Sequence, residues 1–445
     1  MFDLIVRGGI AATPNGILPA DVGVRDGLIA EIGDLTSADA AKIVEAKGLH
    51  VLPGVIDTQV HFREPGFEYK EDIETGTKAA VLGGVTAVFE MPNTKPSTIT
   101  PEDLADKIAR ARNRAWCDIA FYIGAAAENV DRLAEYERLP GCAGIKVFMG
   151  SSTGSLLVDS DEMVGRVLAN GRRRVAVHSE DEARLRERRA LVEKPDADVS
   201  LHPVWRDEEV ALRATTRLMR LARAAGRRVH VLHVTSASEI ELLQANRDIA
   251  TVEVTPQHLT LAAPECYRRL GTLAQMNPPI RDSRHRDALW RAVKQGIVDV
   301  IGSDHAPHTR EEKAAAYPNT PAGMPGVQTL LPLLLDHVSR GNLTLERLVD
   351  LTSAGAARIF AIAGKGRIAA GYDADLTLVD LKRTATITDD WIASRCKWTP
   401  FAGTKVTGWP VATIVRGRIV VRDGDLCGPP SGRLVRFQET LGSHG

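Results

Sequence analysis

Short apolar runs rich in β-branched residues alternate with amphipathic segments along most of the chain. The apolar runs cover residues 49–57, 85–93, 117–125, 143–151, 173–180, 228–236, 250–257 and 297–305. The segments between them place apolar residues at helical spacing and have acidic starts and basic ends, as helix dipoles favour. Eight strands alternating with helices predict an α/β fold, a (β/α)8 TIM barrel over residues 53–365.

Both ends of the chain show a different pattern, in which short strands are separated by glycine turns. The first 50 residues contain LIVRGG, DVGVRDGLIAEIG and AKIVEAKG, and the C-terminal part contains GRIAAGYDADLTLVDL and PVATIVRGRIVVRDG. Neither flank is large enough to form a core alone. We therefore expect one small β-sandwich formed by residues 1–52 and 366–430, followed by a tail over 431–445.

Composition narrows the classes of function. The 445 residues are 44% hydrophobic, and 56 Lys and Arg balance 57 Asp and Glu. This balance gives no reason to expect nucleic acid or a membrane surface as a partner, so we expect a small-molecule substrate. The five cysteines are scattered without a CxxC pair, and MFDLIVRGG lacks the pattern of a signal peptide. We expect a cytoplasmic protein without disulfides or membrane spans.

The stretch DTQVHFREPG follows the apolar run VLPGVI, and residues 51–62 are predicted to form one buried strand. Alternate side chains of a strand share a face, so Asp57, Gln59 and His61 lie together, with Arg63 just beyond the strand end. Two histidines at positions i and i+2 would form a metal clamp. In this chain the first of the pair is Gln59, whose amide oxygen is a weaker ligand for zinc than an imidazole.

Further polar residues end the later predicted strands. The C-terminal strand ends of a (β/α)8 barrel gather at one mouth, where the chemistry is performed. The residues at these ends are Asn93, Lys146, His178, His233 and Asp304. His230 points to the opposite strand face from His233 and is predicted to pack.

Each of these residues has a structural alternative. A lone strand-end histidine such as His178 more often forms a core hydrogen bond than binds metal. Lys146 could pair with a carboxylate, and it becomes a ligand only if its neutral amine takes up CO₂ to form a carbamate. Asp304 could cap the following segment, or serve as a ligand and general base. Convergence at one rim favours a metal site, and mixed nitrogen and oxygen donors favour zinc.

The segment 305–325 precedes a long apolar helix and contains several turn-forming residues. We expect it to be a flexible connection over the barrel mouth and a candidate lid. Its tyrosine and threonines could contact substrate or only solvate the loop.

The chain resembles the dihydroorotases of the amidohydrolase superfamily over essentially its whole length. The motifs that support the resemblance are DTQVHFREPG, MPNTKP, GIKVFMGSSTG, VHSED, HVLHVTS, NPPIR, SDHAPH and PAGMPGVQTLLPLLL. The resemblance implies a (β/α)8 barrel and zinc, with a carbamylated lysine that bridges two ions. It also implies reversible cyclisation of N-carbamoyl-L-aspartate to L-dihydroorotate in pyrimidine biosynthesis, by a homo-oligomer.

The resemblance further implies roles for single residues. The metal ligands would be His61 with Asp304 for one ion, His178 with His233 for the other, and Lys146 as the bridge. The substrate contacts would be Arg63, Asn93 and His308 for the carboxylate, and Asn277, Ala322 and Gly323 for the ring amides. Asp304 would also take the proton of the attacking water and deliver it to the leaving nitrogen.

Arg63 decides the substrate prediction. A guanidinium matches a carboxylate bidentately, and dihydroorotate carries a carboxylate where hydantoins and allantoin do not. The alternative is a salt bridge with Glu64 or Glu68 in the same loop. We disfavour it because the alternation of side chains along the strand points Arg63 into the barrel.

Two positions depart from the family pattern, Gln59 and Gln257, where many relatives have histidine. The first departure leaves three outcomes: one zinc ion, two metal ions with Gln59 as a poor partner, or lost catalysis. The intact substrate-binding set favours a working cyclic amide hydrolase. The alternatives are a hydantoinase or allantoinase, and a non-catalytic scaffold that associates with aspartate transcarbamoylase.

Overall fold

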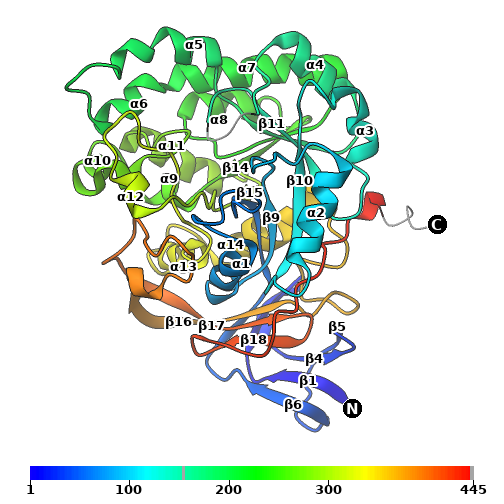
Figure 1. Ribbon diagram of the computed structural model, residues 1–445. Coiled ribbons are helices and arrows are strands. Elements are labelled where there is room, and N and C mark those ends of the chain that lie inside the picture. The colour runs from blue at the N-terminus through cyan, green and yellow to red at the C-terminus, as the bar shows by residue number, and fades with distance from the viewer. Residues whose placement is uncertain (153–155, 441–445) are drawn as a thin grey trace.

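Figure 1 shows the computed structural model, which describes residues 1–152 and 156–440. The barrel forms the upper part of this view, and the strands of both chain ends form the lower part. Residues 441–445, the end of the predicted tail, lie outside the described part of the chain. Within the described residues, no helix is both long and apolar enough to cross a membrane.

The central sheet has eight parallel strands that follow one another in chain order. They are β8 (Val55–Val60), β9 (Val85–Glu90), β10 (Asp118–Gly124), β11 (Cys142–Phe148), β12 (Val175–His178), β13 (Val229–Val231), β14 (Ala250–Val254) and β15 (Val300–Ile301). A parallel bridge between Val60 and His305 joins the two outer strands and closes the ring. The predicted (β/α)8 TIM barrel is confirmed.

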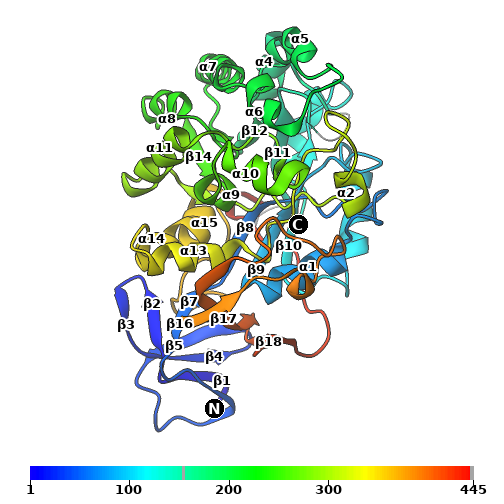
Figure 2. The ribbon, with the colours of Figure 1, turned by 90° about the vertical axis from the view of Figure 1, so that its left-hand side faces the viewer.

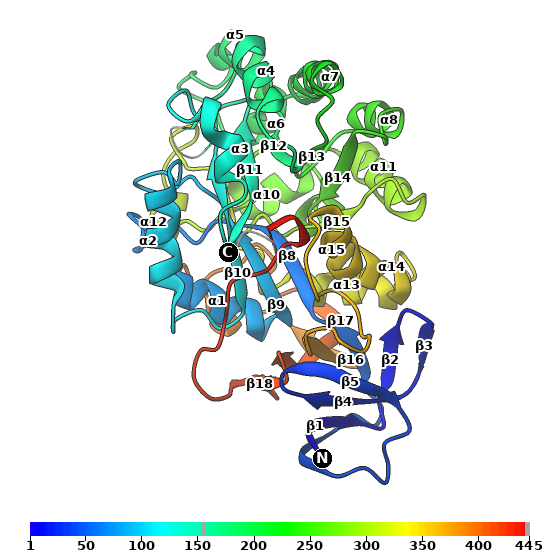
Figure 3. The same ribbon diagram turned by 90° about the vertical axis from the view of Figure 1, so that its right-hand side faces the viewer.

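Helices surround the barrel, as Figures 2 and 3 show from two sides. The longer ones are α1 (Ile73–Leu82), α2 (Pro101–Ala111), α4 (Asp161–Ala169), α7 (Glu208–Ala225), α8 (Ala237–Gln244), α11 (Ser283–Lys294) and α13 (Leu330–Ser339). The shorter ones are α3 (Leu133–Tyr136), α5 (Glu182–Glu187), α6 (His202–Trp205), α9 (Pro256–Thr260), α10 (Glu265–Leu270), α12 (Arg310–Lys313), α14 (Leu345–Val349) and α15 (Gly355–Ile359). Most of them start after a polar cap, as at α1, where the Asp72 side chain accepts from the Thr75 N–H.

Both chain ends contribute to one sandwich of two sheets. The four-stranded sheet contains β5 (Leu28–Gly33), β4 (Asp21–Arg25), β1 (Phe2–Arg7) and β6 (Ala40–Glu45). The seven-stranded sheet contains β19 (Asp425–Leu426), β18 (Arg418–Arg422), β17 (Lys405–Val415), β16 (Leu376–Thr386), β7 (His50–Pro53), β2 (Ile10–Thr13) and β3 (Gly16–Pro19). Leu4, Val24, Val51, Leu376 and Ile414 pack in one buried cluster that joins the sheets. The predicted small β-sandwich of both ends is confirmed.

The prediction of a single strand over residues 51–62 is wrong. The chain leaves the sandwich with β7 and enters the barrel with β8, and Gly54 lies between them. A Cβ atom at Gly54 would lie 2.1 Å from Thr86 Oγ1 and 2.8 Å from Asp375 Cβ, so only glycine fits this crossing. The backbone N–H of Gly54 donates to the Asp375 carbonyl at 2.8 Å, which holds the crossing in place.

Candidate active site

A cavity of about 20 Å³ lies at the C-terminal ends of the barrel strands. Its wall consists of Gln59, His61, Arg63, Asn93, Lys146, Phe148, Ser152, His178, His233, Asn277, Asp304, Ala306, Ala322 and Gly323. Among the predicted site residues, His308 is outside this wall, and its ring contacts two residues of it, Arg63 and Ala322. The structure thus brings the predicted residues together, whereas their chemical roles stay predictions.

Three residues of the cavity have a left-handed backbone. The φ angles are 64° at Arg63, 36° at His233 and 44° at Asp304. Each lies within three residues of the end of a barrel strand. Left-handed conformations cost free energy in residues other than glycine, and such strain is concentrated at functional sites.

His61 and Asp304 form one pair of candidate ligands. His61 Nε2 lies 3.3 Å from Asp304 Oδ1, and His61 Nδ1 lies 2.7 Å from Asn93 Oδ1. The Asn93 amide oxygen only accepts, so the proton is on Nδ1 and the Nε2 lone pair faces the carboxylate. Burial lowers the pKa of His61 well below its ordinary value, which keeps the ring neutral.

Gln59 also contacts Asp304. The Gln59 Nε2 group donates to Asp304 Oδ1 at 2.9 Å, whereas Oε1 is buried without a hydrogen-bond partner among the described residues. The reverse amide orientation would place two oxygens against each other. Gln59 therefore orients the carboxylate of Asp304. Gln257, the other departure, lies outside the cavity wall and donates to the Ser303 carbonyl at 2.7 Å.

His178 and His233 form the second pair, with 3.1 Å between His178 Nδ1 and His233 Nε2. His178 Nε2 donates to Glu180 Oε2 at 2.9 Å, and Arg206 donates to the same carboxylate. This hydrogen bond directs the His178 Nδ1 lone pair at His233, as carboxylates do for metal-binding histidines. Burial alone would raise the pKa of Glu180. The charge of Arg206 and the hydrogen bond from His178 outweigh this effect and hold the pKa of Glu180 below its ordinary value.

Lys146 lies in the same cavity wall as both pairs. Burial is the main cause that lowers the pKa of His61 and of His178, and the charge of Lys146 lowers both further. Lys146 Nζ is buried without a hydrogen-bond partner among the described residues, 4.4 Å from the ring centre of Phe148. Burial lowers the pKa of Lys146 to about 7. An amine that is partly neutral near neutral pH is the form that can accept CO₂.

These polar atoms fit a divalent metal ion. When Asp304 is ionised, two acceptors face each other at the His61 contact, which requires a proton or a cation beside them. Neutral imidazoles and a carboxylate are ligands that zinc takes in proteins. The unpartnered Lys146 amine at the same mouth is consistent with a further ligand position.

A separate acidic cluster, Asp118, Asp373 and Asp375, lies at the opposite end of the barrel, where β10 begins. The ammonium of Lys365 contacts these three carboxylates at 2.7, 2.9 and 2.5 Å. The lysine already neutralises this cluster, so we assign it as a buried ion-pair network rather than a metal site.

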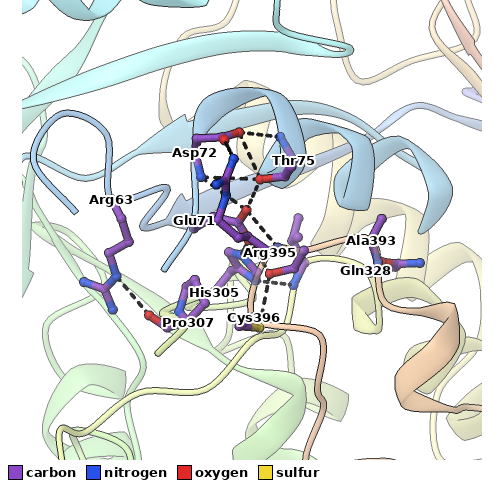
Figure 4. A network of polar contacts seen from close by, with 12 residues as sticks. Arg63, Glu71, Asp72, Thr75, His305, Pro307, Gln328, Ala393, Arg395 and Cys396 are labelled. Atoms are coloured by element: carbon purple, nitrogen blue, oxygen red, sulfur yellow. Dashed lines mark hydrogen bonds and ion pairs between the residues drawn. The ribbon is translucent and has the colours of Figure 1, made fainter. Parts of the chain in front are cut away.

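Arg63 provides positive charge at the cavity. It is buried, and its Nε donates to the Pro307 carbonyl at 3.2 Å, as Figure 4 shows. Among the described residues no carboxylate pairs with Arg63, and Glu64 instead binds Arg114 at 2.7 Å. The salt-bridge alternative for Arg63 is therefore wrong. Burial lowers the pKa of Arg63 to about 10, which leaves it charged at neutral pH.

His308 leaves the Arg63 guanidinium available. Lys70 Nζ lies 3.1 Å from His308 Nδ1, and an ammonium only donates, so the ring proton is on Nε2. That proton faces the Ala322 carbonyl at 3.1 Å. Arg63 Nη2, 3.3 Å from the same nitrogen, therefore has no acceptor there and keeps its N–H groups for an anion.

A buried network supports the loop after β15 (Figure 4). His305 Nδ1 accepts from the Gly326 N–H at 3.1 Å, and His305 Nε2 lies 3.2 Å from Glu71 Oε2. The Ser394 hydroxyl donates to the same Glu71 oxygen. Ser394 belongs to the segment between β16 and β17, so the C-terminal part of the chain reaches the barrel mouth.

A family model described as "Amidohydrolase family" matches residues 50–420. The chain belongs to the amidohydrolase family. A dihydroorotase from Halobacterium salinarum is 39% identical over 414 residues, which cover 90% of this chain and 93% of that one. An allantoinase from Rubrobacter xylanophilus is 36% identical over 458 residues, which cover 99% of each chain. The solved structure of an L-hydantoinase (dihydropyrimidinase) from Arthrobacter aurescens has a TM-score of 0.93 at 29% identity, and the match covers 98% of this chain and 100% of that chain.

The predicted family is confirmed, and the chain is an enzyme of the cyclic amide hydrolase class. Sequence reasoning missed three residues of the wall of this amidohydrolase, Phe148, Ser152 and Ala306. Phe148 and Ser152 follow Lys146 in the motif GIKVFMGSS, and Ala306 follows Asp304 in SDHAPH. Their short distance along the chain from these two predicted site residues could have indicated them. Sequence reasoning also missed Glu180, which the motif VHSED places two residues after His178.

Proposed function

We propose that this amidohydrolase is a dihydroorotase, which interconverts N-carbamoyl-L-aspartate and L-dihydroorotate in cytoplasmic pyrimidine biosynthesis. The observation that carries the proposal is Arg63, a buried cation at the cavity without a carboxylate partner among the described residues. A substrate carboxylate satisfies it bidentately, with Asn93 and His308 beside it. The 39% identity to a relative named dihydroorotase supports the same substrate.

Zinc is the proposed metal. His61 and Asp304 would hold one ion, His178 and His233 would hold a second, and Lys146, as a carbamate, would be a ligand shared by both. The two histidine contacts and the buried, unpartnered amine support this arrangement. Gln59 donates to Asp304 and therefore orients this ligand. We propose that the site binds one or two zinc ions. A bound zinc ion makes water nucleophilic near neutral pH and polarises the amide carbonyl.

The residues of this chain position the ring and move its protons. Asn277 and the backbone of Ala322 and Gly323 hold the ring amides. Asp304 accepts a proton from the water that adds to the carbonyl carbon. It returns this proton to the ring nitrogen as the carbon–nitrogen bond breaks, and the same steps in reverse close the ring.

The lid predicted for residues 305–325 stays part of the proposal, because nothing in the described contacts tests whether this loop opens. The loop is not a bare connection, because it contains α12 and its Tyr317 is buried, with the hydroxyl 3.3 Å from His202 Nδ1.

The experiment is a comparison of substrates with one zinc-loaded preparation. We expect kcat/KM for L-dihydroorotate to exceed that for hydantoin and allantoin by about 100-fold or more, because only dihydroorotate has a carboxylate for Arg63. Turnover of the neutral rings together with none of dihydroorotate would contradict the proposal.

Two alternatives have specific support. The 36% identity to an allantoinase favours a neutral ring, although Arg63 would then be a buried cation without an anion to bind. Gln59 favours a non-catalytic scaffold, and this reading predicts no zinc, no turnover and tight association with aspartate transcarbamoylase. Homo-oligomerisation remains a prediction for either case.

A further inference from the structure

Lys313 is a buried lysine at the C-terminal end of α12, outside the cavity wall. Its Nζ donates to three backbone carbonyls, those of Gln275 at 3.1 Å, Pro321 at 2.9 Å and Gly323 at 3.0 Å. Among the described residues it forms no ion pair with a carboxylate. The side chain is therefore committed to binding backbone rather than to balancing charge.

The number of acceptors matches the charged form of this lysine. An ammonium has three N–H donors, whereas the neutral amine has two and would turn a lone pair toward the third carbonyl. Burial lowers the pKa of Lys313 to about 7, and the negative charge of Glu312 acts in the opposite direction. Burying a cation is costly, and three satisfied donors offset that cost.

The three carbonyls belong to two segments that meet at the cavity. Gln275 lies two residues before Asn277, and Pro321 and Gly323 flank Ala322. The Gly323 N–H also donates to the Gln275 carbonyl at 2.9 Å, and Gln275 Nε2 donates to the Thr320 carbonyl at 3.0 Å, so the two segments are already joined twice without the lysine. The Lys313 ammonium donates to backbone carbonyls of both segments, and it does so from outside the cavity.

A Cβ atom at Gly323 would lie 2.4 Å from the Ala306 carbonyl oxygen, and its φ is 138°. The backbone of the loop is therefore pressed against the segment that follows Asp304. Small shifts of Gly323 change the shape of the cavity directly, and the Lys313 contact to its carbonyl restrains such shifts.

We propose that Lys313 is a positioning residue for the substrate ring, because its ammonium holds the Asn277 segment and the Ala322–Gly323 backbone at a fixed separation. This inference rests on the proposed function, in which those two segments contact the ring amides. Lys313 itself touches no substrate. Its loss should weaken ring binding more than it slows the chemistry at Asp304.

The test is the variant Lys313→Met, with Arg173→Met as a matched control. Arg173 is also a buried cation that donates to three carbonyls, those of Glu137, Cys142 and Ala143, but at the opposite end of the barrel. We expect Lys313→Met to raise KM for dihydroorotate about 10-fold while kcat falls less than about threefold. The control should lose thermal stability with KM unchanged.

A merely structural role of Lys313 would lower stability and the active fraction without changing KM, and that result would overturn the proposal. Lys313→Arg, which keeps the charge and the donors, should give a KM between those of wild type and Lys313→Met. If Lys313→Met does not fold, Lys313→Gln takes its place, because a glutamine amide has no charge and only two N–H donors, and a KM equal to wild type in that variant overturns the proposal.

Amide hydrogen exchange separates this inference from the proposed function. We expect faster exchange in Lys313→Arg or Lys313→Met at residues 275–277 and 320–324, and unchanged exchange elsewhere at the mouth. Wild-type protein that shows no dihydroorotate turnover contradicts the proposed function alone. Unchanged exchange at both segments contradicts the role of Lys313 whatever the substrate.

Discussion

At the scale of single residues, hydrogen-bond partners decide which ring nitrogen each histidine presents. The Asn93 amide oxygen accepts a hydrogen bond from His61 Nδ1–H, and the Glu180 carboxylate accepts one from His178 Nε2–H. The remaining lone pairs face Asp304 and His233 respectively. The sequence shows the histidines but not their tautomers, because Asn93 and His61 come from different strands and meet only in the folded barrel.

Arg63→Ala tests the role of the buried guanidinium. We expect kcat/KM for dihydroorotate to fall by about 100-fold or more, because hydrogen bonds to a charged group contribute about 1.5–3 kcal/mol each. Metal content, measured by elemental analysis, should not change, since Arg63 contacts no candidate ligand. Arg114→Ala is the control, as Arg114 binds Glu64 in the same loop without reaching the cavity. Retained activity in Arg63→Ala would exclude a carboxylate-binding role.

The candidate ligands at the mouth could be predicted because each lies at or just past the end of a recognisable strand, whereas Asn277, Ala322 and Gly323 came only from the family resemblance. His178 and Asp304 are examples, and parallel strands of a barrel bring their ends to one place. Lys313 and Glu71 could not be found in this way. Their contacts depend on loop backbones, and a sequence pattern does not show which carbonyl a side chain reaches.

At the scale of elements, alternation of apolar runs and amphipathic segments was sufficient to predict the eight barrel strands. The error at residues 51–62 has a local cause. The apolar run over residues 51–56 spans the end of β7 and the start of β8, and the change of sheet occurs at Gly54 without a polar break. Periodicity cannot show such a crossing.

The N-cap of α1 gives an element-scale prediction with a pH dependence. Burial alone would raise the pKa of Asp72, but Thr75 and Arg395 lower it by more, so the folded-state pKa lies below its ordinary value. The resulting stabilisation is present above the unfolded pKa of about 3.9 and is lost as pH falls through the lower folded value. Asp72→Ala should therefore cost about 1 kcal/mol in the free energy of unfolding at neutral pH.

Denaturant unfolding of both proteins checks this prediction. The difference between wild type and Asp72→Ala should narrow from neutral pH to about pH 3.5. Ser160→Ala is the control, because the uncharged Ser160 hydroxyl caps α4 by accepting from the Met163 N–H. A difference for Asp72→Ala that stays constant over this range would show that its charge has no part in capping.

At the scale of the whole molecule, the C-terminal part of the chain supports the barrel mouth as well as the sandwich. Trp398 Nε1 donates to the His308 carbonyl at 2.7 Å, and Gln328 Nε2 donates to the Trp391 carbonyl at 2.7 Å. Together with Ser394 and Glu71, these contacts fix the loop that follows Asp304. The site therefore depends on residues of the barrel and on the segment between β16 and β17.

In the proposed reaction, a divalent metal ion at this mouth acts on a carboxylate-bearing ring that Arg63 binds. The most direct measurement is dihydroorotate turnover and zinc content in the same sample, before chelation, after chelation and after zinc is restored. We predict that turnover is lost with the metal and returns in proportion to bound zinc. Full turnover by metal-free protein, or a zinc-loaded protein that leaves dihydroorotate intact, would contradict the account.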